Sequence, residues 1–355
     1  MNGRIVRIAV DAMGGDRFPD VLVEGSIAAL QRFPDVEISL VGDQSAVGDC
    51  LAGTLETVYG KRGVKHAEES VRERIRVVHA SEVIDMSESP GRAVRTKKDS
   101  SIVVCNKLCR SGEVDAVIAA GNTGAAMAAS LLYMGRLAGV SRPAIMALFP
   151  SENNFVAVLD VGANTDCKPG NLYQFGVMAS IYTTHVLGYE NPRIGLLNIG
   201  EERTKGNELT TETYALFEQS DLNFVGNIEG RDIFRGAADV VVCDGFVGNV
   251  ILKFGESIFG FITHQLRKKS SRSLMRKLVA GLMRPVFGEI KKELSSEDYG
   301  GAPLLGVDGI SIICHGNSSP TAIANAAKVA RQCVLEEVNL LIKNEFSRNN
   351  FALNE

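Results

Sequence analysis

Seven short runs of apolar residues recur along the chain, each followed by a polar loop that contains glycine. Most of these loops lead into a stretch with apolar residues at helical spacing. Strands without polar alternation, separated by helices, indicate a mainly parallel sheet that is covered on both faces. The seven segments are residues 5–16, 37–43, 115–124, 156–166, 194–207, 239–249 and 310–319.

Two helices are especially clear in the pattern, over residues 19–33 and 320–343. Pro19 suits the first turn of the former, where its missing N–H has no cost. In the latter, apolar residues recur with the period of a helix that is buried on one side.

In a parallel sheet, the loops that follow the strands share one edge, and ligands bind along it. Turn formation alone would explain a glycine in any one of the loops. The seven loops are also rich in Asp, Asn, Ser and Thr, which turn formation does not require. We therefore expect the active site at the carboxyl edge of the sheet.

The segment Gly121–Gly124 is the first candidate for an anion site, because it joins a strand to an alanine-rich helix. Backbone amides at a helix start favour an anion, although the exposed dipole contributes only about 0.3–1 kcal/mol. Asn122, Thr123 and Gly124 are therefore candidates to bind phosphate, while helix capping explains Asn122 and Thr123 equally well. Further donors stand in other loops: Lys205, Asn207, His315, Ser318 and Ser319.

Known nucleotide and metal patterns are missing from the sequence, including GxxxxGK[ST], GxGxxG and HExxH. Asp11 and Asp16 are candidate magnesium ligands, but isolated loop aspartates more often cap turns or helices. We expect no metal and no other cofactor. Because no Ser-His-Asp order or GxSxG elbow indicates an acyl-enzyme, phosphate itself is the expected nucleophile.

Composition is consistent with one large α/β domain over residues 1–355, or with two closely joined lobes. The chain has 355 residues, of which 45% are hydrophobic, and a net charge of −4, which argues against a general nucleic-acid binder. Its seven cysteines form no CxxC pair and lie mostly among apolar residues, so we expect reduced thiols in the cytoplasm. A strand begins at the N-terminus, so no signal peptide is expected.

A basic amphipathic helical excursion is expected over residues 255–294. Residues 266–292 contain nine lysines and arginines and a single acidic residue, Glu289. Its apolar stripe could pack on the chain or a dimer partner, lie on an anionic membrane, or dock a carrier protein. Near an anionic leaflet each basic residue contributes about 1 kcal/mol. The candidate membrane residues are Leu274, Leu278, Leu282, Met283 and Phe287.

A second basic segment, residues 89–101, contains Arg92, Arg95, Lys97 and Lys98. A solvated face explains such a run as well as contact with an acidic carrier protein or with phosphate does. Both interpretations stay open.

The loops taken together resemble the phosphate acyltransferases, which make acyl phosphate from acyl-acyl carrier protein. The matching stretches follow one another over nearly the whole chain. They are DAMGGDRFP (11–19), SPGRAVRTKKDSSI (89–102), GNTGA (121–125), LDVGAN (159–164), NIGEERTKGNE (198–208), NIEGRD (227–232), VVVCDGFVGNVILK (240–253), YGGAPLLGV (299–307) and CHGNSS (314–319).

This resemblance implies a three-layer α/β/α sandwich with a mostly parallel sheet, related to phosphotransacetylase and to isocitrate and isopropylmalate dehydrogenases. It also implies a cytoplasmic homodimer that associates peripherally with the membrane. The product would feed the glycerol-3-phosphate acyltransferase of phospholipid synthesis.

The mechanism that we expect is attack by a phosphate oxygen on the thioester carbonyl, with rate gained from orientation of the two reactants. Asn122, Thr123, Ser318 and Ser319 would seat the phosphate, and Lys205 would offset its charge. Asn164 and the amides near Gly162 are candidate oxyanion donors. His315 would protonate the departing sulfur, although a structural role explains a lone histidine equally well. Asp160 and Asp244 would orient Lys205 or cap loops.

Three alternatives to this function stay open. A phosphotransacetylase would use acetyl-CoA or another acyl-CoA in place of the carrier protein. A dehydrogenase would need nicotinamide. A scaffold on the membrane would bind carrier protein without turnover, and it would leave the polar loops unexplained.

Overall fold

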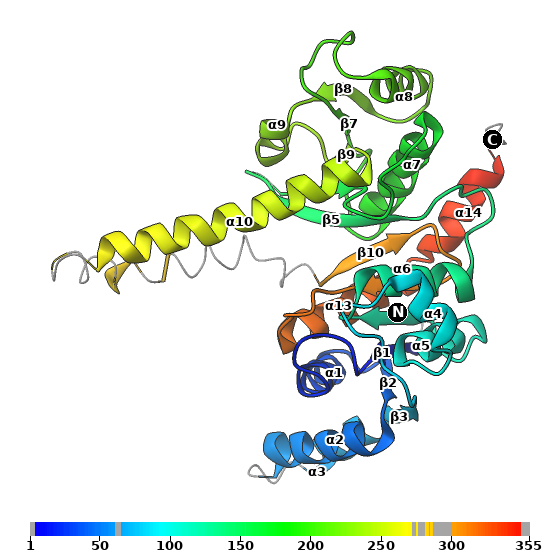
Figure 1. Cartoon of the computed structure of the whole chain (residues 1–355), viewed down its shortest axis with the longest axis vertical. Helices are drawn as coiled ribbons and strands as arrows, with labels where there is room; N and C mark the ends of the chain where they lie inside the picture. The colour runs from blue at the N-terminus through cyan, green and yellow to red at the C-terminus, as the bar shows by residue number, and fades with distance from the viewer. Residues whose placement is uncertain are drawn as a thin grey trace.

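The computed structural model describes residues 4–60, 65–152, 154–271, 275, 281–283, 285–286 and 300–348. Its centre is an 11-stranded sheet with the order β3-β2-β1-β4-β11-β10-β5-β6-β9-β7-β8 (Figure 1). The strands are β1 (Val6–Asp11), β2 (Val36–Gly42), β3 (Ile75–His79), β4 (Ala116–Ala119), β5 (Ala144–Pro150), β6 (Phe155–Leu159), β7 (Ile194–Leu197), β8 (Phe224–Ile228), β9 (Val240–Val242), β10 (Ala302–Leu305) and β11 (Ile310–Ile313).

Helices lie on both faces of this sheet. They are α1 (Asp20–Arg32), α2 (Gln44–Tyr59), α3 (Lys65–Arg72), α4 (Pro90–Thr96), α5 (Ser101–Arg110), α6 (Thr123–Ala129), the π-helix η1 (Ser130–Met134), α7 (Pro169–His185), α8 (Glu208–Glu218), α9 (Gly230–Arg235), α10 (Gly245–Ser270), α13 (Pro320–Leu335) and α14 (Val338–Arg348). Ile8 and Val10 of β1 belong to one buried cluster and Ala9 to another. Because successive strand residues point to opposite faces, both faces of the sheet are covered. The predicted three-layer α/β fold with a mostly parallel sheet is confirmed.

Strand direction divides the sheet into two halves. Strands β3, β2, β1, β4 and β11 are parallel to one another, as are β6, β9, β7 and β8. Between them, β10 is antiparallel to both β11 and β5, and β5 is antiparallel to β6. Three reversals make the two halves run in opposite directions. The prediction of a single carboxyl edge is therefore wrong: the loops after β1, β4 and β11 lie at one end of the strands, and those after β6, β7 and β9 at the other.

The two clearest predicted helices are both present, with one difference. Residues 19–33 form α1 nearly as expected. Residues 320–343 are divided into α13, which ends at Leu335, and α14, which begins at Val338. Glu337 between them has a φ of 50°, a left-handed backbone conformation that no α-helix contains.

Helix α10 projects from the body of the molecule, as Figure 1 shows. Its 26 residues would span about 39 Å at 1.5 Å per residue. It begins ten residues before the predicted start of the excursion at residue 255. Among the helices of the described residues, only α10 is long and apolar enough to cross a membrane. Its most apolar stretch is 12% buried. A single helix of this kind is weak evidence for a membrane span. Leu274, Leu278 and Phe287 lie outside the described residues, while Leu282 and Met283 are exposed.

Candidate active site

Three loops meet where β1, β4 and β11 end, because these strands are neighbours in the sheet. The backbone N–H of Asp16 donates to the carbonyl oxygen of Gly316 at 2.8 Å. A Cβ on Gly14 would lie 2.8 Å from the backbone nitrogen of Gly121, so glycine is needed for this close approach. The loops therefore bring together eight of the predicted site residues. They are Asp11, Asp16, Asn122, Thr123, Gly124, His315, Ser318 and Ser319.

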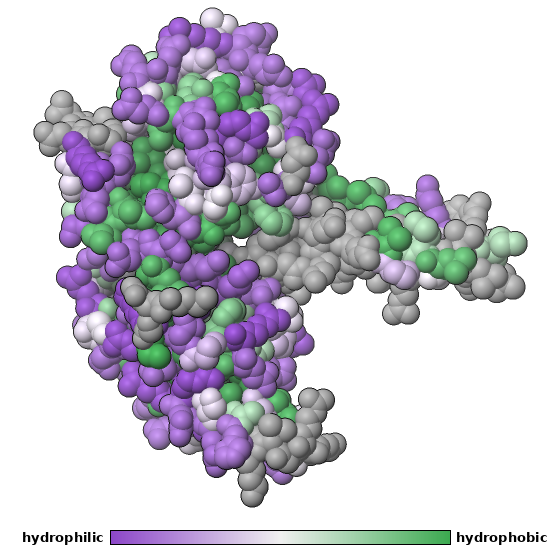
Figure 2. Space-filling view, turned by 180° about the vertical axis from the view of Figure 1, so that it is seen from behind, coloured by the Kyte–Doolittle hydropathy of each residue, from purple (hydrophilic) through white to green (hydrophobic). Residues whose placement is uncertain are grey.

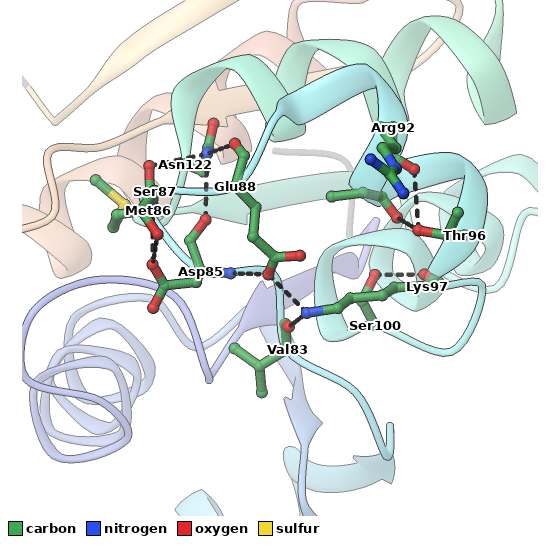
Figure 3. Close-up of polar contacts among 11 residues, drawn as sticks. Val83, Asp85, Met86, Ser87, Glu88, Arg92, Thr96, Lys97, Ser100 and Asn122 are labelled. Atoms are coloured by element: carbon green, nitrogen blue, oxygen red, sulfur yellow. Dashed lines mark hydrogen bonds and ion pairs between the residues drawn. The ribbon is translucent and has the colours of Figure 1, made fainter.

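Asn122 uses its side chain to hold a neighbouring loop (Figure 3). Its Oδ1 accepts a hydrogen bond from the backbone N–H of Ala125 at 3.0 Å, which caps α6. Its Nδ2 donates to the carbonyl oxygens of Asp85, Met86 and Glu88 at 3.2–3.3 Å. The capping interpretation of Asn122 is confirmed. Its role in phosphate binding stays a prediction, and its side chain is already bonded within the protein.

The backbone amides that follow Asn122 are better placed to meet an anion. Among the hydrogen bonds of the described residues, none uses the backbone N–H of Thr123 or Gly124 as donor. Thr123 is exposed, and Gly124 is half-buried. These two N–H groups therefore offer the helix-start site that the sequence predicted.

The second basic segment lies directly beside this helix start. A Cβ on Gly124 would be 2.6 Å from Cγ of Pro90, the first residue of α4. Lys97 is committed to the protein: its Nζ lies 2.6 Å from Oε1 of Glu88 and donates to the carbonyl oxygen of Val83 at 2.7 Å (Figure 3). That hydrogen bond lowers the pKa of the Glu88 carboxyl. The other three cations of the segment, Arg92, Arg95 and Lys98, are exposed.

Asp11 and Asp16 differ sharply although they share a loop. Asp16 is exposed, whereas Asp11 is buried and accepts a hydrogen bond from the backbone N–H of Met13 at 3.3 Å. Burial raises the pKa of Asp11 to about 6, against the opposing effect of hydrogen bonds from Ser101 and Met13. A buried carboxylate that titrates near neutrality typically marks a functional site. Within the described part of the chain, no group of three or more His, Cys, Asp or Glu gathers as metal ligands.

The loop after β11 contributes His315, Ser318 and Ser319. Ser319 caps α13 by accepting from the backbone N–H of Ala322 at 3.3 Å, and Ser318 is buried beside it. His315 is about half exposed, and its Nε2 lies 3.2 Å from Oε1 of Glu256 on α10. The other carboxylate oxygen of Glu256 lies 3.0 Å from Nζ of Lys253.

Sequence reasoning missed Glu256. One signal could have found it, because it is the only acidic residue between positions 245 and 270. A lone carboxylate in an apolar and basic helix suggests a specific partner. That partner, His315, stands 59 positions further along the sequence, so sequence spacing does not identify it.

Asp160 lies at the opposite end of the sheet and organises its own loop. Its Oδ1 accepts from the backbone N–H groups of Ile145, Gly162 and Ala163, and its Oδ2 from the backbone N–H and the Nδ2 of Asn164. The second N–H of Asn164 Nδ2 donates to the carbonyl oxygen of Pro143 at 2.8 Å. The donors predicted to form an oxyanion hole are thus bonded to Asp160 and Pro143. Their expected role is corrected to a structural one, because a buried carboxylate must find donors of its own.

The remaining predicted residues lie in the same half of the molecule as Asp160. Asp244 caps α10 by accepting from Phe246 and Val247, and Asn207 caps α8 by accepting from Thr210. Lys205 is exposed, and its carbonyl oxygen accepts from Nδ2 of Asn198. No contact among the described residues joins Lys205 to Asn122 or to Ser318.

Comparison with known proteins adds to this geometry. The model of a family described as "Fatty acid synthesis protein" matches residues 6–341. A phosphate acyltransferase of Desulfitobacterium hafniense is 48% identical over 344 residues, which cover 97% of this chain and 98% of that protein. A phosphate acyltransferase of Heliobacterium modesticaldum is 49% identical over 329 residues, with 93% and 94% covered.

Among solved structures, the EutD phosphotransacetylase from Staphylococcus aureus is similar in fold. Its TM-score is 0.59 at 13% sequence identity, and the match covers 94% of this chain and 95% of that one. That structure shows the fold, while the relatives at 48–49% identity identify the chain as an enzyme that transfers acyl groups. More specifically, the chain belongs to the phosphate acyltransferase family.

Proposed function

We propose that this chain transfers a long-chain fatty acyl group from acyl-acyl carrier protein to inorganic phosphate. The observation that carries the proposal is the meeting of three loops at the ends of β1, β4 and β11. There the loop that contains Thr123 and Gly124 and the loop that contains Ser318 both contact the loop after β1, the first at Gly121 and the second at Gly316. A phosphate held this way is bound by hydrogen-bond donors that leave its oxygens free to react.

The proposed reaction is direct attack by a phosphate oxygen on the thioester carbonyl, which the site promotes by orienting both reactants. The backbone amides of the Asn122–Gly124 segment, with Ser318 and Ser319, would seat the phosphate. His315, exposed at the rim of the same loops, would protonate the departing sulfur.

A comparison of donors tests this function. Purified protein would receive phosphate with a long-chain acyl-carrier protein, the matching acyl-CoA or acetyl-CoA, and acyl phosphate would be trapped as hydroxamate. We expect acyl phosphate from the carrier-protein donor at the highest kcat/KM, and none without phosphate. A preference for acetyl-CoA would favour the phosphotransacetylase alternative, and binding without turnover would favour the scaffold.

The cation that offsets the charge of phosphate can be assigned by substitution. Lys205 was the expected cation, whereas Arg92 is exposed on α4, the helix whose first residue, Pro90, lies beside Gly124. If Lys205 takes part, Lys205→Ala raises the KM for phosphate; unchanged kinetics would remove it from the site. Arg92→Ala is the matched substitution: it raises the KM for phosphate if α4 supplies the charge. If α4 docks acyl-carrier protein, Arg92→Ala raises the KM for that donor as well.

Homodimer formation and peripheral membrane attachment belong to the same proposal. Their support is the apolar face of α10, defined here as Val250, Phe254, Ile258 and Phe261, which are all exposed at helical spacing. A surface of this kind is costly to leave in water. An acyl phosphate with a long tail also favours a site near lipid, since release into water costs about 0.8 kcal/mol per CH₂. The product would then pass to a glycerol-3-phosphate acyltransferase of phospholipid synthesis.

Vesicle flotation tests the membrane attachment. Leu282 is 81% exposed in the basic excursion, and Leu340 is 49% exposed on α14. We expect Leu282→Glu to reduce co-flotation with anionic vesicles, while Leu340→Glu, the matched control, leaves it unchanged. Equal flotation of wild type and Leu282→Glu would contradict attachment through this segment.

A further inference from the structure

Helix α10 connects the two ends of the sheet. It begins beside the Asp160 loop, where the backbone N–H of Gly245 donates to the carbonyl oxygen of Asn164 at 2.7 Å. Further along, Gly255 faces the ring of Phe149, at the end of β5 that pairs with the start of β6. Glu256, the next residue, then reaches His315. The helix thus delivers a carboxylate from one half of the fold to the phosphate loops of the other.

The geometry at His315 determines which ring nitrogen is available for chemistry. Nε2 is the ring nitrogen that faces Glu256, 3.2 Å from its Oε1, and the two groups form an ion pair when the ring is protonated. No hydrogen bond of the described residues uses Nδ1 of His315. When the ring is an imidazolium, Nδ1–H is therefore the free donor.

Glu256 is itself held in place, because Lys253 pairs with its second oxygen one turn earlier on α10. The side chains of His315 and Glu256 are 47% and 35% exposed. Ion pairs with this much solvent access contribute little to stability, so a purely structural role explains the contact poorly. What the contact does set is which ring nitrogen faces the carboxylate of Glu256 and which one faces away from it.

We propose that Glu256 is a positioning residue for acyl transfer, holding His315 so that its Nδ1–H is presented to the leaving sulfur. This inference rests on the proposed function. In the step itself, a phosphate oxygen forms the C–O bond and the C–S bond breaks. The sulfur takes the bonding electron pair and the proton from Nδ1. The neutral imidazole then regains a proton from the P–O–H of the acyl phosphate, so no outside acid is needed.

The leaving group supplies a test that a structural role would not affect. An alkyl thiolate needs a proton as it departs, whereas a nitrophenyl thiolate is stable without one. We therefore expect Glu256→Gln to lower kcat about 10- to 100-fold with an alkyl acyl thioester and by less than about threefold with the nitrophenyl acyl thioester. The KM for phosphate should stay unchanged.

Matched variants complete the experiment. Glu218→Gln breaks an exposed ion pair with Arg203, 2.6 Å long and remote from His315, and it should affect neither donor. His315→Asn should show the same dependence on the donor, and adding Glu256→Gln to it should cause no further loss. Glu256→Asp, which keeps the charge, should retain more activity than Glu256→Gln.

The outcomes separate the two proposals. Wild-type protein that makes no acyl phosphate from either donor would overturn the proposed function, and this inference with it. Active wild type, with Glu256→Gln losing the same factor on both donors or losing nothing, would overturn the role of Glu256 alone.

Discussion

Two buried aspartates, Asp11 and Asp160, show how differently one residue type is used at the two ends of the sheet. Asp160 accepts five hydrogen bonds from its own loop and from β5. Asp11 has fewer donors, and burial raises its pKa to about 6. Burial also raises the pKa of Asp160, although the hydrogen bonds from its loop oppose this shift. Asp160 therefore organises its loop, while Asp11 bears the cost of burial with fewer donors.

Stability should depend on pH through Asp11. Its pKa is about 6 when folded and about 3.9 when unfolded, so the folded state binds the proton more tightly and stability falls as pH rises from about 4 to about 6. Asp11→Asn removes this penalty, and the free energy of unfolding of the variant relative to wild type should increase by about 2 kcal/mol between pH 4 and pH 7. Urea unfolding at both pH values measures it. A difference independent of pH would show that Asp11 does not titrate in this window.

Asp160→Asn should lower the free energy of unfolding at neutral pH, in contrast to Asp11→Asn. In the wild type, N–H donors point at both carboxylate oxygens of Asp160. In the variant, an NH₂ group replaces one of these oxygens and cannot accept from the donors, so their hydrogen bonds are lost without replacement. We expect a loss of about 2–4 kcal/mol in the free energy of unfolding at neutral pH. Thermal and urea unfolding would detect it, and a variant as stable as wild type would show that the loop is held by other contacts.

At the scale of elements, α10 is fixed to the body at one end only. Gly248 packs against the backbone of Asp160, where a Cβ would overlap the carbonyl oxygen. Gly260, twelve positions further along the same helix, has no heavy atom within 4 Å of the Cβ position. The two glycines thus mark the anchored and the projecting parts of one helix.

Alanine at these two positions should have effects of opposite sign. Gly248→Ala forces the helix away from the Asp160 loop and should lower the free energy of unfolding by about 2–3 kcal/mol. Gly260→Ala restricts the unfolded chain and should raise it by about 0.5–1 kcal/mol. Equal effects of the two substitutions, measured by urea unfolding, would contradict the anchoring of α10 at Gly248.

At the scale of the whole molecule, the projecting helix carries hydrophobic residues away from the body, whose surface in the space-filling view is a mixture of polar and hydrophobic areas (Figure 2). Phe254 and Phe261 on the apolar face of α10 are 65% and 63% exposed. Full burial of such a ring is worth about 1.5–3 kcal/mol. A second copy that covers this face would gain that energy twice for each ring, because a symmetric interface uses the same surface on both chains.

Charge on this face should therefore shift the oligomeric state. We expect the double variant Phe254→Glu/Phe261→Glu to weaken self-association at least about 100-fold, since both rings lose their burial and like charges meet across the interface. Ile199→Glu, at an apolar residue that is 80% exposed elsewhere, is the control. Sedimentation analysis over a range of concentrations measures the effect, and a wild-type chain that is monomeric throughout would contradict the proposed homodimer.

Much of the local organisation was predictable because it depends on neighbours in sequence. The strand-loop-helix order, the helix after Pro19 and the capping role of Asp244 follow from residues a few positions apart. The family resemblance, spread over nearly the whole chain, could also be established from the sequence. The use of Asn122 as a clamp was harder to foresee, since its partners Asp85, Met86 and Glu88 lie more than 30 positions earlier.

The sequence by itself determined the class of fold, the loops that carry polar groups and the absence of known cofactor patterns, because these are written in local composition and spacing. Only the tertiary structure decided which loops meet. Because β10 and β5 pair in antiparallel fashion, the strands of the two halves run in opposite directions, which separates Lys205 and Asn164 from Asn122. Helix α10 brings Glu256 to His315. Strand direction and helix path depend on the packing of distant segments, and no local pattern of residues specifies them.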